Sequence, residues 1–258
     1  IRDEDSLRLV FDAVRPDAIC HLAAKADVRE SMDEPREYAE VNILGSLNLL
    51  ELSREYGVQK IVYASTGGAV YDEPEYLPAD EEHPINPLDP YGASKHHVEH
   101  YLHIYRRHYA IDYTVLRFPN VYGPRQDPLG EAGVVAIWTG QMLNGDEAVI
   151  YGTGEQERDF VYVGDIARAN VLALTKGSGE ILNLGSGIGT SIGELFELLK
   201  KAAGYEDGAR YAPAKEGEVL RIYITNERAE DLLGWTPSIP LEQGLAKTVA
   251  YFRETELS

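Results

Sequence analysis

A chain of 258 residues with 44% hydrophobic content is long enough for one large or two modest domains and a substantial core. Its formal net charge of −19 argues against a nucleic-acid partner, because phosphate backbones bind to basic faces. No run approaches the roughly 20 apolar residues of a membrane span, and no secretory leader is visible. We therefore expect a cytoplasmic protein that contacts no membrane.

The single cysteine, Cys20, lies within an apolar run that has the character of a strand. One cysteine excludes an internal disulfide framework, and its setting favours a buried, inert thiol over a nucleophile. Cys and His residues show no spacing typical of metal ligands, so we expect no metal site.

Strand and helix patterns alternate through the first half of the chain. The predicted elements are strand 17–22, helix 34–56, strand 59–64, helix 90–109 and strand 112–117. This βαβ alternation is typical of a doubly wound parallel sheet. Segment 67–90 is rich in proline and is predicted as a long irregular connection, and connections of that length are usually functional.

Beyond residue 120 the alternation loosens and a smaller region is added. We predict a helix near 131–145 and short strands near 147–151 and 158–162, and then helix 163–176 and strand 180–184 that return to the sheet. Ser191 and Glu194 form a capping box that opens another helix, and a final helix covers 240–254.

Tyr91 and Lys95 are the most informative pair in the sequence. In a helix over 90–109 they lie one turn apart, about 6 Å along the axis, on a shared face. A lysine ammonium favours the phenolate and lowers the phenol pKa from about 10 towards neutrality, as a general base requires. The Tyr-x-x-x-Lys spacing is also a common accident on helix surfaces, so context has to decide.

That context is the end of the preceding strand. Ser65 and Thr66 follow the buried run 59–64 in a Ser-Thr-Gly-Gly turn, and open α/β sheets bind ligands at the carboxyl ends of their strands. A hydroxyl there could bind the reacting oxygen and pass a proton to Tyr91. No strand followed by a Gly-x-Gly-x-x-Gly turn precedes residue 17, so a phosphate-binding turn for a dinucleotide is missing.

Eight segments, in this order, resemble the extended short-chain dehydrogenases/reductases, and most of all the NAD-dependent sugar-nucleotide epimerases typified by UDP-glucose 4-epimerase. They are His21-Leu-Ala-Ala-Lys25, Asn42-Ile-Leu-Gly45-Ser46, Ser65-Thr66, Pro90-Tyr91-Gly-Ala-Ser-Lys95, Leu116-Arg117-Phe118-Pro-Asn120-Val-Tyr-Gly-Pro124, Arg158-Asp-Phe-Val-Tyr-Val-Gly-Asp165, Asn183-Leu-Gly-Ser-Gly187 and Leu233-Gly-Trp-Thr-Pro237. Each segment alone is a weak signal, and the ordered set is strong.

The resemblance implies an α/β fold with a doubly wound, Rossmann-like parallel sheet and a smaller C-terminal substrate-binding region. Against the family, Ile1 falls just after the third strand, so we expect the chain to be N-terminally truncated by two βα units, about 55–60 residues. An NAD-binding domain is expected at 1–119 with a returning segment at 159–185. A sugar-nucleotide-binding region is expected at 120–158 and 186–258.

By resemblance, Tyr91 is the catalytic base, Lys95 lowers its pKa and holds the nicotinamide ribose, and Thr66 is the hydroxyl donor. Alignment from Val70 and Tyr71 backwards would place Gly67 there instead, and we prefer Thr66 because glycine has no proton to give. The implied NAD contacts are Ala23, Ala24, Lys25, Asn42, Ser65, Tyr91, Lys95 and Phe118.

Three of these NAD contacts have alternative readings. Lys25 could be a solvated strand-end lysine, Asn42 a helix asparagine bonded to the neighbouring strand, and Phe118 ordinary core.

The resemblance also implies a UDP-sugar site formed by Asn120, Val134, Tyr151, Arg158, Lys215 and Glu218. Arg158 suits a pyrophosphate because two phosphates require fixed, delocalised cations, which a guanidinium supplies bidentately. Lys215 stands where the family often has a second arginine, and it offers positive charge without the bidentate geometry of a guanidinium. Tyr151 resembles a residue that stacks near the uracil.

The implied activity is interconversion of UDP-glucose and UDP-galactose by transient oxidation at C4. The alternatives are a UDP-glucuronate decarboxylase or epimerase and a dTDP-glucose 4,6-dehydratase, although dehydratases carry an Asp-Glu pair where this chain has Gly67 and Gly68. A nucleotide-sensing protein without turnover is a further alternative, which the intact Thr66, Tyr91 and Lys95 disfavour. Helices 34–56 and 90–109 resemble those that pair two subunits, so we expect a homodimer.

Overall fold

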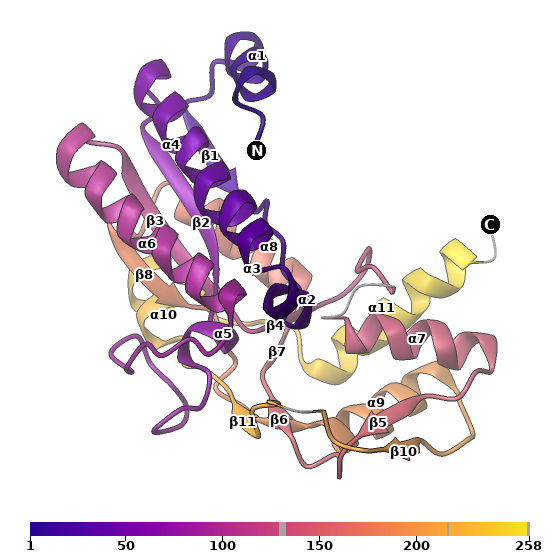
Figure 1. Ribbon diagram of the computed structural model, residues 1–258. Helices are drawn as coiled ribbons and strands as arrows, with labels where there is room; N and C mark the ends of the chain where they lie inside the picture. The colour runs from indigo at the N-terminus through magenta and orange to yellow at the C-terminus, as the bar shows by residue number, and fades with distance from the viewer. Residues whose placement is uncertain (129–132, 216, 257–258) are drawn as a thin grey trace.

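The computed structural model describes residues 1–128, 133–215 and 217–256 (Figure 1). At its centre lies a sheet of four parallel strands: β1 (Ala18–His21), β2 (Lys60–Thr66), β3 (Asp112–Phe118) and β8 (Glu180–Asn183), in the order β1-β2-β3-β8. The predicted α/β fold with a parallel sheet is confirmed, and β8 returns to the sheet beside β3 as expected.

Strand β2 is buried along its whole length, because it lies between two other strands and is covered on both faces. Ile61 and Tyr63 pack on one face with α4 (Gly45–Tyr56) and α6 (Pro90–Tyr109). Val62 packs on the other with α8 (Val163–Ala173) and α10 (Glu227–Leu233). The alternation follows from the two-residue period of a strand.

The observed β2 is longer than the predicted strand 59–64, which placed Ser65 and Thr66 in a turn. Both residues are in the strand, because Thr66 pairs in register with Phe118 and the Gly67 amide donates to the Phe118 carbonyl at 2.8 Å. The carboxyl edge of the sheet therefore begins at Thr66 and Phe118. The connection that follows includes one short helix, α5 (Gly68–Tyr71).

The predicted helix 34–56 is three helical segments in succession: α3 (Pro35–Tyr38), a π-helical turn η1 (Ala39–Leu44) and α4. Besides α5, two helices in the described first half were not predicted, α1 (Glu4–Val14) and α2 (Val28–Asp33). Cys20 is exposed, contrary to expectation, because β1 is an edge strand of the described sheet.

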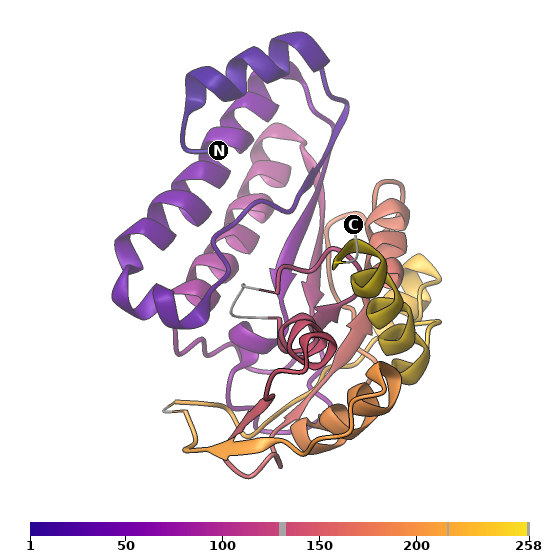
Figure 2. The same cartoon turned by 90° about the vertical axis from the view of Figure 1, so that its right-hand side faces the viewer.

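The second region consists of short strands and three helices that pack on one another (Figures 1 and 2). The helices are α7 (Val134–Asn144), α9 (Ile192–Ala203) and α11 (Leu241–Glu256). The strand pairs are β4 (Asn120–Tyr122) with β7 (Phe160–Tyr162), β5 (Val149–Tyr151) with β10 (Arg210–Ala212), and β6 (Glu157–Arg158) with both β9 (Thr190–Ser191) and β11 (Arg221–Ile222).

Local sequence signals explain several boundaries in this region. The Ser191 hydroxyl caps α9 by accepting from the Glu194 amide at 3.1 Å, as the capping box predicted. The predicted strand 158–162 is split between β6 and β7 at Asp159, whose buried carboxylate accepts from the Ser186 amide at 3.0 Å. The start of the helix predicted near 131–145 falls partly outside the described residues, and α7 accounts for the rest. Within the described ranges no helix is long and apolar enough to span a membrane.

Candidate active site

Helix α6 begins against the end of β2 and brings Tyr91 to Thr66. Asp89 caps the helix by accepting from the Gly92 amide at 2.7 Å, and Pro90 occupies its first turn. Gly92 lies so close to α5 that a Cβ atom would collide with the Ala69 carbonyl. With this close approach, the Thr66 hydroxyl hydrogen-bonds the Tyr91 phenol.

Lys95 follows one turn later and is 3% exposed. Its Nζ lies 4.3 Å from the centroid of the Tyr63 ring and, within the described parts of the chain, makes no hydrogen bond. Burial lowers the pKa of Lys95 to about 7, and the nearby Glu99 carboxylate opposes the shift. The ammonium donors of Lys95 therefore have no acceptor among the described residues.

The expected depression of the Tyr91 pKa is wrong for the chain by itself. Burial raises the pKa of Tyr91 to about 12, and the hydrogen bond from Thr66 only partly offsets it. The reason is that desolvation penalises the phenolate, while Lys95 is desolvated too and lies over Tyr63. Tyr91 is therefore a neutral phenol until another positive charge approaches.

Ser65 is turned away from Thr66, because neighbouring residues of a strand point to opposite faces. Its hydroxyl donates to Glu99 Oε1 at 2.6 Å. Arg117 binds the same carboxylate bidentately, with Nε to Oε1 at 3.0 Å and Nη2 to Oε2 at 2.7 Å. The expected cofactor contact through the Ser65 hydroxyl is therefore not supported, and Thr66 is the hydroxyl beside Tyr91.

This buried set continues beyond Arg117. Its Nη1 donates to the Tyr71 hydroxyl at 2.7 Å, which donates to Asn183 Oδ1 at 2.9 Å. We call the five residues Ser65, Tyr71, Glu99, Arg117 and Asn183 the interior network. Three of them, Ser65, Arg117 and Asn183, occur in the resemblance segments, yet only Ser65 was expected to have a role.

The loop after β1 is held by Asn42. Its Oδ1 accepts from the Lys25 amide at 2.8 Å, and its Nδ2 donates to the Lys25 carbonyl at 3.0 Å and to Ser94 Oγ at 2.9 Å. The reading of Asn42 as a helix asparagine that braces a neighbouring segment fits these bonds. Lys25 Nζ pairs with Glu30 at 2.9 Å and Glu37 at 3.0 Å, so its charge is already matched.

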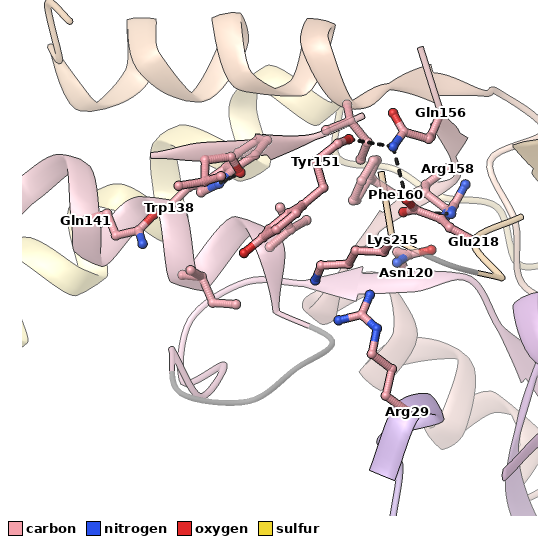
Figure 3. A pocket seen from close by; sticks show the side chains of 14 residues that line it. Arg29, Asn120, Trp138, Gln141, Tyr151, Gln156, Arg158, Phe160, Lys215 and Glu218 are labelled. Carbon is pink, nitrogen blue, oxygen red and sulfur yellow. Dashed lines mark hydrogen bonds and ion pairs between the residues drawn. The ribbon is translucent and has the colours of Figure 1, made fainter. Parts of the chain in front are cut away.

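A cleft of about 340 Å³ opens beside β4, β5 and β6 (Figure 3). All six residues expected to bind the sugar nucleotide line it: Asn120, Val134, Tyr151, Arg158, Lys215 and Glu218. The sequence did not single out the other residues of its lining, which are Arg29, Ile137, Trp138, Gln141, Val149, Gln156, Phe160 and Ile192. Most come from segments whose helical or strand character was predicted but whose inward face was not. Arg29 lies in α2, which was not predicted, and Gln156 lies between two predicted strands.

Polar contacts organise one wall of the cleft (Figure 3). Gln156 Nε2 donates to the Tyr151 carbonyl at 2.7 Å and to Glu218 Oε2 at 3.1 Å. Arg158 Nη2 lies 3.4 Å from Glu218 Oε1, and Lys215 Nζ lies 4.2 Å from the centroid of the Tyr151 ring. Glu218 therefore fixes a cation and an amide, and does not itself offer a site for an anion.

Two amide oxygens in the lining have no hydrogen-bond partner among the residues the structure describes. They are Gln141 Oε1 and Gln156 Oε1, and both are buried. A buried carbonyl oxygen without a donor is costly, so the cleft suits a ligand that brings N–H or O–H donors as well as negative charge.

A parallel sheet with a threonine, a tyrosine and a lysine at its carboxyl edge, beside a cleft with cationic walls, defines the extended short-chain dehydrogenase/reductase class. The model of the NAD dependent epimerase/dehydratase family matches residues 1–185, and the chain belongs to this family.

Among relatives, a putative UDP-glucose 4-epimerase of Methanocaldococcus jannaschii is 48% identical over 254 residues, which are 98% of this chain and 82% of that protein. The solved structure of UDP-glucose 4-epimerase from Thermotoga maritima with UDP-glucose is 48% identical, with a TM-score of 0.97 over 99% of this chain and 83% of that one. The Thermus thermophilus UDP-glucose 4-epimerase complexed with NAD is 42% identical, with a TM-score of 0.92 over 98% and 82%.

Proposed function

We propose that the protein is an NAD-dependent UDP-glucose 4-epimerase, which interconverts UDP-glucose and UDP-galactose. The observation that carries the proposal is the hydrogen bond between Thr66 and Tyr91 at the sheet edge, with the buried Lys95 one helical turn further on, in a chain whose relatives in this family include UDP-glucose 4-epimerases. The cleft supplies a separate place for the nucleotide.

The residues at the sheet edge fit the nicotinamide end of NAD. The ammonium of Lys95 is buried without a hydrogen-bond partner among the described residues, and ribose hydroxyls would satisfy it. Ala23 and Ala24 would lie under the cofactor, on the loop that Asn42 holds at Lys25. Phe118, partly buried at the end of β3, would pack near the ring.

Tyr91 takes the proton of the sugar 4-hydroxyl, directly or through Thr66, and later returns it. Its pKa of about 12 keeps it protonated in the chain alone, and a positive charge beside the phenol would lower that value. Bound NAD⁺ supplies that charge and the acceptor for the C4 hydride. The interior network holds β2, β3 and α6 in register around these atoms.

The cleft accounts for the nucleotide part of the substrate. Arg158 and Lys215 supply positive charge for a diphosphate, and Asn120 offers an amide beside them. Tyr151 presents its ring towards the cleft (Figure 3). The unpartnered oxygen of Gln156 would accept an N–H group of the base. A sugar held through its nucleotide can turn over at C4 while the diphosphate stays bound.

A second candidate is a related reaction on UDP-glucuronate. The geometry distinguishes this reaction from 4-epimerisation of UDP-glucose less sharply than it distinguishes a 4,6-dehydratase. A 4,6-dehydratase is disfavoured, because a side chain at Gly67 would collide with Ile224, and no carboxylate can occupy that position without a shift. With glycine at 67 and 68, the chain lacks the Asp-Glu pair that would move a second proton.

We also propose the two-part division expected from the sequence, with NAD bound by 1–119 and 159–185 and the sugar nucleotide by 120–158 and 186–258. One apolar cluster under α4 and α6 and another between α7, α9 and α11 are separate, which supports the division, although α10 of the second region packs against the sheet. A cytoplasmic homodimer formed through α4 and α6 completes the proposal. Exposed Leu44 and Ile104 on this side of the molecule favour it, and light scattering would test it.

In the deciding experiment the full-length protein is incubated with NAD⁺ and UDP-glucose, and the products are resolved by NMR. UDP-galactose should appear with the wild type and not with Tyr91→Phe, while both bind NAD⁺. Turnover of UDP-glucuronate with UDP-glucose unchanged would move the assignment to the second candidate. If the wild type binds NAD⁺ and UDP-glucose but converts neither UDP-glucose nor UDP-glucuronate, the proposal is wrong.

A further inference from the structure

Two histidines on the outer side of α6 point their ring nitrogens at each other. His96 Nε2 lies 3.1 Å from His100 Nε2, and the two rings meet edge to face with centroids 4.6 Å apart. They are four residues apart, which places them one above the other on one helix face. This His-x-x-x-His spacing was passed over in the sequence, where no metal-ligand pattern had been recognised.

The tautomer of His96 is set by its other neighbour. His96 Nδ1 lies 3.0 Å from Glu99 Oε2, and that carboxylate is paired bidentately with the Arg117 guanidinium and accepts from the Ser65 hydroxyl. An ionised carboxylate can only accept, so Nδ1 carries the proton and, in the neutral ring, Nε2 presents a lone pair towards His100. A carboxylate that holds the far nitrogen of a histidine is the usual outer partner of a metal ligand.

His100 can present its lone pair to the same point. In the metal-free chain one of the two Nε2 atoms must donate to the other, and His100 is left to do so. With its proton on Nδ1, both Nε2 lone pairs converge. At metal–nitrogen distances of about 2.0–2.1 Å, a 3.1 Å separation gives an N–metal–N angle of roughly 100°.

The geometry points to a divalent transition-metal site at His96 and His100, with Zn²⁺ as the representative ion. Imidazole nitrogens suit Zn²⁺, Ni²⁺ and Cu²⁺, and helical pairs at this spacing chelate one ion. No group of three or more such ligands converges anywhere in the described chain, so the two histidines supply the protein ligands and water or a second copy supplies the rest. Neither the proposed reaction nor its cofactor uses this ion.

The test is titration of the untagged chain with Zn²⁺ in chelator-free buffer, followed by calorimetry, with the visible spectrum of Co²⁺ as a second readout. We expect saturable binding by the wild type. His96→Gln and His100→Gln should each weaken it at least about tenfold, as much as the loss of an outer-shell partner costs in known sites. The ion should also raise the melting temperature of the wild type but not that of His96→Gln or His100→Gln.

His97→Gln is the matched control, because His97 is exposed on the same turn and its Nδ1 is bonded to the Ala93 carbonyl at 2.9 Å. It should bind Zn²⁺ like the wild type, and circular dichroism should show all three variants folded. One ion per chain or one per two chains supports the site. Absence of saturable binding in the wild type, or equal affinity in His96→Gln, His100→Gln and wild type, overturns it.

Discussion

Glu99→Gln is the most revealing single change, because it removes the charge at the centre of the interior network and leaves its shape. Glu99 and Arg117 are each 3% exposed, and no water can replace the lost partner of the guanidinium. Removal of one member of a buried ion pair typically costs about 3–5 kcal/mol. For a domain of this size that corresponds to a fall in melting temperature of about 6–20 °C.

The lowered pKa of Glu99 points in the same direction. Burial alone would raise it, but the hydrogen bonds from His96 and Arg117 and the Arg117 charge lower it from 4.5 to about 2. A depressed pKa means that the folded state favours the charged form, so this stability is present above about pH 4.5 and is lost as the pH falls towards 2. The shift is worth about 3 kcal/mol.

The assay is urea unfolding followed by circular dichroism, at several pH values, for wild type, Glu99→Gln and Arg117→Met. In Glu99→Gln the loss of stability between about pH 4.5 and 2 should shrink by up to about 3 kcal/mol. The double variant Glu99→Gln/Arg117→Met should lose less than the two single losses together, because no charge is left unpaired.

Glu147→Gln is the control for this series, since its ion pair with Arg210 is short, at 2.6 Å, but more than half exposed on both sides. It should change stability by about 1 kcal/mol or less. If Glu99→Gln were no more harmful than Glu147→Gln, or if the two network losses simply added, the argument from burial and pairing would be wrong.

Further predictions concern the proposed activity. Thr66→Val should lower kcat and shift the rising limb of the pH–rate profile to higher pH, because the hydrogen bond from Thr66 favours the Tyr91 phenolate and its loss raises the pKa of Tyr91. An unchanged profile would contradict this. Gln156→Leu should raise KM for UDP-glucose about tenfold with little change in kcat. Gln156 braces the cleft wall, and the substitution leaves the Tyr151 carbonyl without that donor. Asn42→Ala should weaken NAD⁺ binding, measured by fluorescence, more than it lowers the kcat at saturating cofactor, because the Lys25 loop loses its brace.

Strong local signals made much of the fold predictable. Helix α6 begins and ends where predicted, at Pro90 and Tyr109, because Asp89 and Pro90 define its start. The buried run of β2 was visible, but its last two residues were not, since their strand pairing depends on Phe118 in another segment. That small difference decides which of Ser65 and Thr66 faces Tyr91.

The site was predictable in its members more than in its electrostatics. The six cleft residues were expected from the resemblance to the family, and the structure brings them together in one cleft. The pKa of Tyr91 could not be read from its spacing to Lys95, because desolvation depends on everything packed around both side chains. The π-helical turn around Asn42 was also hidden, since its wider spacing leaves no distinct apolar period.

The interior network also constrains how the protein can open. It joins β2, β3, β8, α5 and α6, so separation of any of these elements would leave a buried charge or a buried hydroxyl without its partner. Partial unfolding around the catalytic edge should therefore be rarer than fraying of α1 or the chain ends. In hydrogen exchange, the amides around Thr66 and Lys95 should exchange only through the slowest opening of the sheet. The arrangement of Thr66, Tyr91 and Lys95 would then be lost only when the sheet itself unfolds.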